Sequence, residues 1–166
     1  MILTSDDFVG RYEISVGYGS NKLDELIEER VPFIIAELLG ADFAVEFLKQ
    51  VEEDTLTPEN EKIFNELIFN VEYFCARVLY KSQGVKKMLL NILYSEYQEM
   101  IGTPTSLGKI KTKTEGGELV TDNYTDRFRY YNDGISTYRA IQAYIKDNID
   151  DYPLFKGVDK ETTWLI

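Results

Sequence analysis

The chain has 166 residues, of which 44% are hydrophobic, and a formal net charge of −11. This length and apolar content predict one folded domain with its own core, and no apolar run approaches the roughly 20 residues that a bilayer needs. There is no histidine and only one cysteine, Cys75. The commonest general base, the commonest zinc ligand and an intrachain disulfide are therefore missing, and we expect no cofactor and no metal.

The negative charge is concentrated in the amino-terminal half. Residues 1–80 carry 17 acidic and 6 basic side chains, whereas residues 81–166 carry 12 of each. Tight binding to nucleic acid depends on cations that neutralise phosphates. This composition therefore predicts an acidic body that repels DNA on average, which still suits a wall past which DNA slides without sticking.

Helical periodicity predicts five helices over most of residues 1–150. Their expected ranges, in chain order, are 21–40, 41–51, 58 to about 80, 85–101 and 125–149. Ahead of them, Thr4 or Ser5 is suited to cap a short helical turn. Pro32 should kink the first helix, and Gly134 should either kink the last one or mark a close contact with another helix. The third helix rests on apolar residues spaced three and four apart, namely Phe64, Leu67, Val71, Phe74 and Val78.

Residues 103–122 break this helical pattern and predict a protruding β-hairpin. Lys109, Lys111 and Lys113 alternate with Ile110, Thr112 and Thr114, so the three lysines would share one face of a strand. Gly116 and Gly117 supply the turn. The lysine face is either a solvated edge that resists aggregation or the contact face of a docking arm, and composition alone does not choose between the two.

The carboxyl-terminal residues 151–166 predict an extended tail that follows the helical domain of residues 1–150. The tail has no helical period, yet it holds Tyr152, Phe155, Trp164 and Leu165. Solvated tails seldom carry this much apolar surface. We therefore expect these four residues to pack either on the chain's own core or on a partner protein.

Pairs of glutamates are the only candidates for catalytic chemistry in the sequence. They are Glu28 with Glu29, Glu52 with Glu53, Glu59 with Glu61, and Glu96 with Glu99. Di-iron bundles combine such glutamates with histidines, and this chain has none. Solvated acidic helix faces are the simpler interpretation, and we do not expect an enzyme.

The order of elements resembles a known family. The stretch Asp24–Arg30, continuing to Gly40 and followed at once by a second helix, is similar to the opening helices of tailed-phage head–tail connector proteins, also called adaptor or head-completion proteins. The helix 85–101 with its Ser106-Leu-Gly-Lys-Ile hairpin entry, and the long helix 125–149, resemble the rest of that family's order of elements. The longer acidic connector at residues 52–57 and the aromatic tail depart from the family's pattern.

The resemblance implies a mainly α fold, a helical bundle of about five helices with one protruding hairpin and an extended tail. It also implies a virion neck protein, assembled in the host cytoplasm, whose copies form a ring, typically twelvefold, beneath the portal. Such a ring would extend the DNA channel without binding DNA specifically and would link the portal to the tail. Two other functions stay open, namely a small acidic intracellular module that mimics nucleic acid and an enzyme that uses the paired glutamates.

Overall fold

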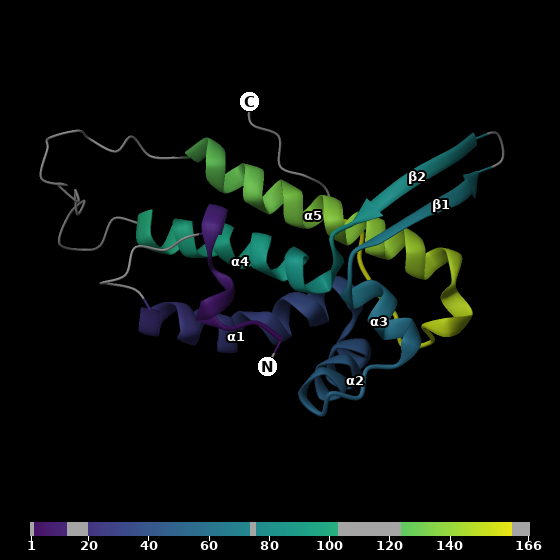
Figure 1. Cartoon of the computed structure of the whole chain (residues 1–166), viewed down its shortest axis with the longest axis horizontal. Coiled ribbons are helices and arrows are strands. Elements are labelled where there is room, and N and C mark those ends of the chain that lie inside the picture. Colours follow the sequence, from purple (N-terminus) through teal and green to yellow (C-terminus); the bar gives the residue numbers. More distant parts are fainter. Residues whose placement is uncertain (1, 13–19, 74–75, 103–123, 161–166) are drawn as a thin grey trace, which may run out of the picture.

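The protein is mainly helical, with a small β-hairpin that projects from the helices (Figure 1). The structure is a computed structural model that describes residues 2–12, 20–73, 76–102 and 124–160. Its helices are α1 (Ser20–Leu39), α2 (Ala41–Glu52), α3 (Pro58–Phe64), α4 (Gly84–Gly102) and α5 (Tyr124–Asp147). Short 3₁₀ turns form at Ser5–Asp7, Gly10–Tyr12 and Ile149–Asp151. This confirms the predicted helical bundle with a hairpin as a class of fold.

Helices α4 and α5 form the central pair of the bundle, and they lie side by side in Figure 1. Their contact depends on Gly134, because a Cβ atom at this position would lie 2.6 Å from Ile92 Cγ1 and 3.2 Å from the Met88 carbonyl oxygen. Both distances are shorter than an ordinary van der Waals contact. Of the two roles expected for Gly134, the structure therefore favours the close helix contact.

Helices α1 and α2 complete the core, and α3 packs against α4. Helix α1 continues through Pro32. Gly40, with a φ of 103°, separates α1 from α2. The side chains buried most completely come from every one of these helices and from the amino-terminal segment: Leu3, Tyr12, Ile27, Ile35, Leu39, Phe47, Ile63, Met88, Leu89, Leu93, Ile135 and Tyr138.

The predicted helix over residues 58–80 is wrong beyond Phe64. Helix α3 ends there, and an antiparallel hairpin follows, formed by β1 (Leu67–Tyr73) and β2 (Ala76–Ser82). Leu67 and Val71 suggested a helix because they are four residues apart, but four is also an even number, so they share one face of a strand as well. The intervening Ile68, Asn70 and Glu72 point to the opposite face.

The chain returns from the hairpin across the end of α3, and Gly84 makes this return possible. Its φ is 83°, in the left-handed region that glycine tolerates best. A Cβ atom here would lie 2.3 Å from the Phe64 carbonyl oxygen. The hairpin predicted at residues 103–122 lies outside the described residues, so the hairpin that the structure describes is a different one.

Candidate interaction surfaces

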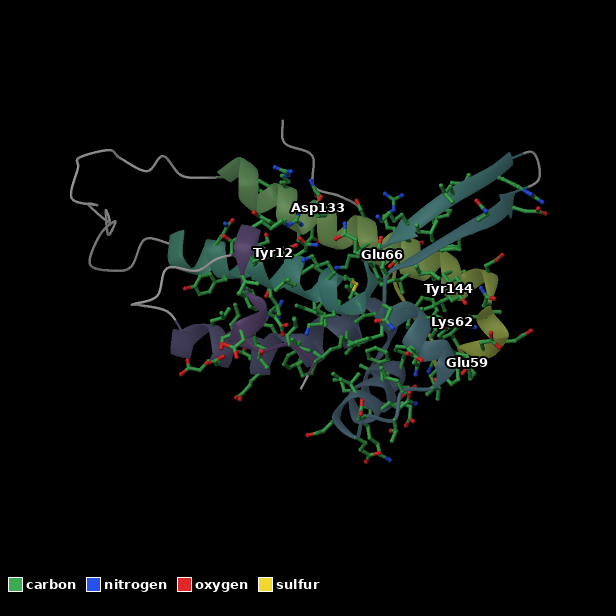
Figure 2. The ribbon with its side chains drawn as sticks, in the orientation of Figure 1. Tyr12, Glu59, Lys62, Glu66, Asp133 and Tyr144 are labelled. Carbon is green, nitrogen blue, oxygen red and sulfur yellow. The ribbon has the colours of Figure 1, made fainter. Side chains whose placement is uncertain are left out.

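The inner face of the hairpin is anchored on α5 through aromatic rings. Phe69 stacks on its cross-strand partner Tyr80, with ring centroids 5.4 Å apart, and meets the edge of Tyr144 on α5 at 5.2 Å. Val71, on the same face, is 8% exposed. A lone two-stranded hairpin is marginal in water, so this contact with α5 is what stabilises it. Figure 2 shows Tyr144 below the two strands.

The outer face of the hairpin is open and partly apolar. Ile68 is 60% exposed and Leu79 is 66% exposed. Two ion pairs lie around them: Arg77 with its cross-strand partner Glu72, and Lys81 with Glu66, the residue just before β1, at 2.7 Å. Within the described residues the sheet has only these two strands, so each strand presents one outer edge. An exposed apolar face and open edges are the features by which sheets recruit partners.

The first part of the tail packs on its own helices. Tyr152 is 2% exposed; its hydroxyl donates to the Glu59 carbonyl oxygen at 2.6 Å, and its ring lies 6.4 Å from that of Phe43. Phe155 is half-buried against the same core. Burial raises the pKa of the Tyr152 hydroxyl. Of the two alternatives that we predicted for the tail, Tyr152 and Phe155 therefore follow the first: they pack on the chain's own core. Tyr152 is buried there and is not available to bind a partner.

The following residues, up to Lys160, lie along the junction of α1 and α2. The Lys156 amide donates to the Leu39 carbonyl oxygen at 3.0 Å, and Lys156 Nζ lies 3.0 Å from Asp42. Lys160 pairs with Glu37 on α1. Two lysines of the tail thus neutralise carboxylates of the acidic amino-terminal half.

A buried polar contact joins the tail to α5. The Tyr138 hydroxyl lies between the carbonyl oxygens of Leu38, at 2.6 Å, and Val158. Gln142 also donates to the Val158 carbonyl oxygen, at 3.0 Å. Burial, with a smaller effect of Asp159, raises the pKa of Tyr138 to about 12. The backbone of residue 158 is therefore held by two side chains of α5.

A hollow of about 190 Å³ opens where α2, α3 and the tail meet. Phe43, Phe47 and Tyr152 line it with aromatic rings, and Leu154, 41% exposed, lies at its edge. Glu46, Glu59 and Asp151 also line it, and no lysine or arginine is among its described lining residues. The periodicity of the sequence did not reveal this site, because its walls come from three segments that only the fold brings together.

A second cluster that the sequence did not reveal holds the amino-terminal segment. The Arg11 guanidinium donates to Asn91 Oδ1 at 2.8 Å and lies 3.2 Å from Asp133, and the Tyr12 hydroxyl donates to the same Asn91 oxygen at 2.8 Å. Lys87 Nζ lies 4.4 Å from the centre of the Tyr12 ring. Figure 2 shows Tyr12 and Asp133 beside each other over α4 and α5. The cluster fastens residues 11 and 12 to the central helix pair.

The other predicted site residues are placed as follows. Lys109, Lys111 and Lys113, and also Trp164 and Leu165, lie outside the described residues. Glu28, Glu29, Glu52 and Glu53 are exposed. In the described part of the chain, no group of three or more acidic, cysteine or histidine side chains is arranged to hold a metal ion. The described helices also include none with the length and apolarity to span a bilayer.

We compared the chain with protein-family models, with curated proteins and with solved structures, and none of them matched it.

Proposed function

We propose that this protein is a structural subunit of a phage head–tail connector, and that the β1–β2 hairpin is its docking arm. The observation that carries the proposal is the hairpin itself: it is anchored at its inner face by Phe69 and Tyr144, and it projects with Ile68 and Leu79 exposed. The order of helices that resembles the connector family adds support. Copies of the subunit would form a ring, typically twelvefold, that docks on the portal and links it to the tail.

The exposed side chains of the hairpin give a reason for docking. Fully burying a leucine or isoleucine side chain contributes about 1.5–3 kcal/mol. Ile68 and Leu79 are about two-thirds exposed, so each would contribute about 1–2 kcal/mol when a partner covers it. Because a ring presents many arms at once, modest contributions from each copy add up to firm attachment.

The acidic surface of α1 fits the passage of DNA through such a ring. Asp24, Glu25, Glu28 and Glu29 are all exposed along this helix. Negative side chains repel phosphates and offer no counterion release. A channel wall of this kind would guide DNA without retaining it.

The experiment uses two aspartate substitutions at equally exposed apolar positions. Leu79→Asp places a charge on the hairpin, and Val9→Asp places one on the amino-terminal segment; both residues are 66% exposed. Analytical ultracentrifugation with the portal protein of the same virus should show multi-copy complexes for the wild type and Val9→Asp. Leu79→Asp should weaken this binding about tenfold or more. The proposal fails if the wild type stays unbound, and the role of the hairpin fails if both variants bind equally.

The exposed carboxylates of α1 also favour a second candidate, an acidic module that mimics nucleic acid and binds a DNA-binding host protein. Affinity purification from infected cells separates the two functions. Recovery of a DNA-binding host protein in place of virion components would favour the mimic, and recovery of the portal would favour the connector.

A further inference from the structure

We propose that the hollow between α2, α3 and the tail receives the lysine-bearing stretch Gly108–Thr114 of a second copy, so that subunits join head to tail. This inference rests on the proposed function and specifies its lateral contact. It rests on the chemistry of the hollow, on a lysine contact already present beside it, and on where residues 103–123 leave the body of the protein.

The chemistry of the hollow suits a segment that alternates cations with an apolar side chain. Its aromatic lining comes from Phe43, Phe47 and Tyr152, and the acidic residues Glu46, Glu59 and Asp151 also line it. Sites for cofactors and drug-sized ligands usually measure about 300–1,000 Å³. A hollow of about 190 Å³ is smaller than these and suits one side chain of an incoming chain. In the sequence Lys109-Ile-Lys-Thr-Lys113, Ile110 lies between two lysines.

The same acidic surface already accepts a lysine from the chain itself. Lys156 of the tail lies 3.0 Å from Asp42 on α2. Glu46 is one helical turn further along α2, and residues four apart share a face of a helix. Its carboxylate accepts a hydrogen bond from Gln50 Nε2 at 2.9 Å, which holds it in place. The hollow therefore continues a surface whose carboxylates bind lysine.

The end of α4 at Gly102 and the start of α5 at Tyr124 bear on which copy supplies the lysines. In Figure 1, α4 ends and α5 begins at one end of the molecule, whereas α2, α3 and the end of α5 lie toward the other. The 24 residues of α5 span about 36 Å. Lys111 follows Gly102 by nine residues and reaches at most about 32 Å from it. Lys113 follows Gly102 by eleven residues and reaches at most about 40 Å. A lysine of the same copy would thus span the length of α5 only on an almost fully extended chain, which favours a lysine from a second copy.

A contact between unlike ends of two copies is heterologous. Such contacts generate rings when the rotation between subunits closes, and filaments when it does not. The complementary charges, lysines at one end and carboxylates at the other, also set the direction of assembly. The ring in our proposed function requires a lateral contact of this form.

The experiment reverses charge on each side of the contact in the full-length chain. One variant carries Lys109→Glu, Lys111→Glu and Lys113→Glu and keeps its hollow intact. The other carries Glu46→Lys and Asp151→Lys and keeps its lysine stretch intact. Each variant alone should self-associate about tenfold or more weakly than the wild type in sedimentation velocity at low salt. An equal mixture should recover association as heterodimers or larger alternating assemblies, because each charged stretch then meets a hollow of opposite charge.

The control is Glu52→Lys with Glu53→Lys, which makes the same change of charge on exposed residues of α2 and its connector that do not line the hollow. This variant should self-associate like the wild type. The inference is overturned if the wild type stays monomeric at millimolar concentration, if the hollow variant associates normally, or if the mixture does not recover association. In each of these cases, binding of many copies to the portal through the hairpin would leave the proposed function standing.

Discussion

At the residue scale, Gly134 allows α4 and α5 to pack closely because its side chain is only a hydrogen atom. Glycine costs a helix about 1 kcal/mol relative to alanine. That cost is offset here because α4 and α5 pack where a Cβ atom would meet Ile92 at 2.6 Å. The side chain of Ile92 is itself buried, at 4% exposure, so it has little room to move.

We predict that Gly134→Ala destabilises the protein by about 1 kcal/mol or more, because overpacking a core costs about 1–3 kcal/mol and outweighs the better helix propensity. Urea unfolding followed by circular dichroism measures the change. Ser136→Ala, on the exposed side of the same helix, is the control and should change stability by less than about 0.5 kcal/mol. A gain in stability for Gly134→Ala would show that α4 and α5 are further apart than the structure has them.

Because the hydroxyl of Tyr138 is buried, we predict that the protein loses stability at alkaline pH. The pKa of its buried hydroxyl is raised to about 12 in the folded protein, against about 10 in the unfolded chain. The unfolded chain thus loses its proton first as pH rises, so the contribution of this group is complete below pH 10 and is lost between about pH 10 and 12. Two pKa units correspond to about 3 kcal/mol.

The measurement is the free energy of unfolding at several pH values between 9 and 12, for the wild type and for Tyr138→Phe. The variant should start less stable, because it loses the hydrogen bond to Leu38, and its stability should fall less steeply with pH. Parallel slopes in the two proteins would mean that Tyr138 does not titrate as its burial implies.

At the scale of elements, the described part of the tail packs on the helices of its own chain. Up to Lys160 it is part of the body, through buried Tyr152 and the hydrogen bonds of Val158 with α5. Trp164 and Leu165 lie beyond the described residues, and their docking on a partner stays a prediction.

Two truncations test this division. Deleting residues 152–166 removes Tyr152 and exposes the rings that it covers, and we expect a loss of about 3–5 kcal/mol of stability, as for other large buried side chains. Deleting residues 161–166 should leave the melting temperature nearly unchanged while weakening binding to the portal. If the shorter deletion unfolds the protein as well, Trp164 and Leu165 belong to the core.

At the scale of the whole molecule, charge governs how the protein meets nucleic acid. The net charge is −11, and several of the basic side chains are already paired within the chain: Lys81, Lys86, Lys146, Lys156 and Lys160 all contact carboxylates. Acidic side chains outnumber basic ones by 29 to 18, so the protein as a whole repels the phosphates of DNA.

We therefore predict that the isolated protein does not bind duplex DNA at about 150 mM salt. Fluorescence anisotropy of a labelled duplex should stay constant as protein is added, and it should also stay constant with the Glu52→Lys, Glu53→Lys variant. A saturating curve that weakens as salt is raised would reveal a cationic surface and would contradict an acidic channel wall.

Much of this architecture can be predicted from the order of the residues. Long apolar stripes, Gly40 and the breaks at Gly84 and Gly102 place α1, α2, α4 and α5 close to their expected ranges, because a helix depends on contacts within a few residues of itself. The acidic body and the absence of histidine need no structure either, since they are properties of composition.

Folding in three dimensions decided the rest. Strands β1 and β2 form a hairpin in place of the predicted helix because Phe69 packs against Tyr144 on α5, which is 75 positions away in the sequence. The tail joins the core because Tyr152 reaches α2 and α3, and the hollow beside it exists only where three distant segments meet. A spacing of four residues places two side chains on the same face in a helix and in a strand alike. Which of the two forms is therefore decided by the tertiary contacts that the segment makes.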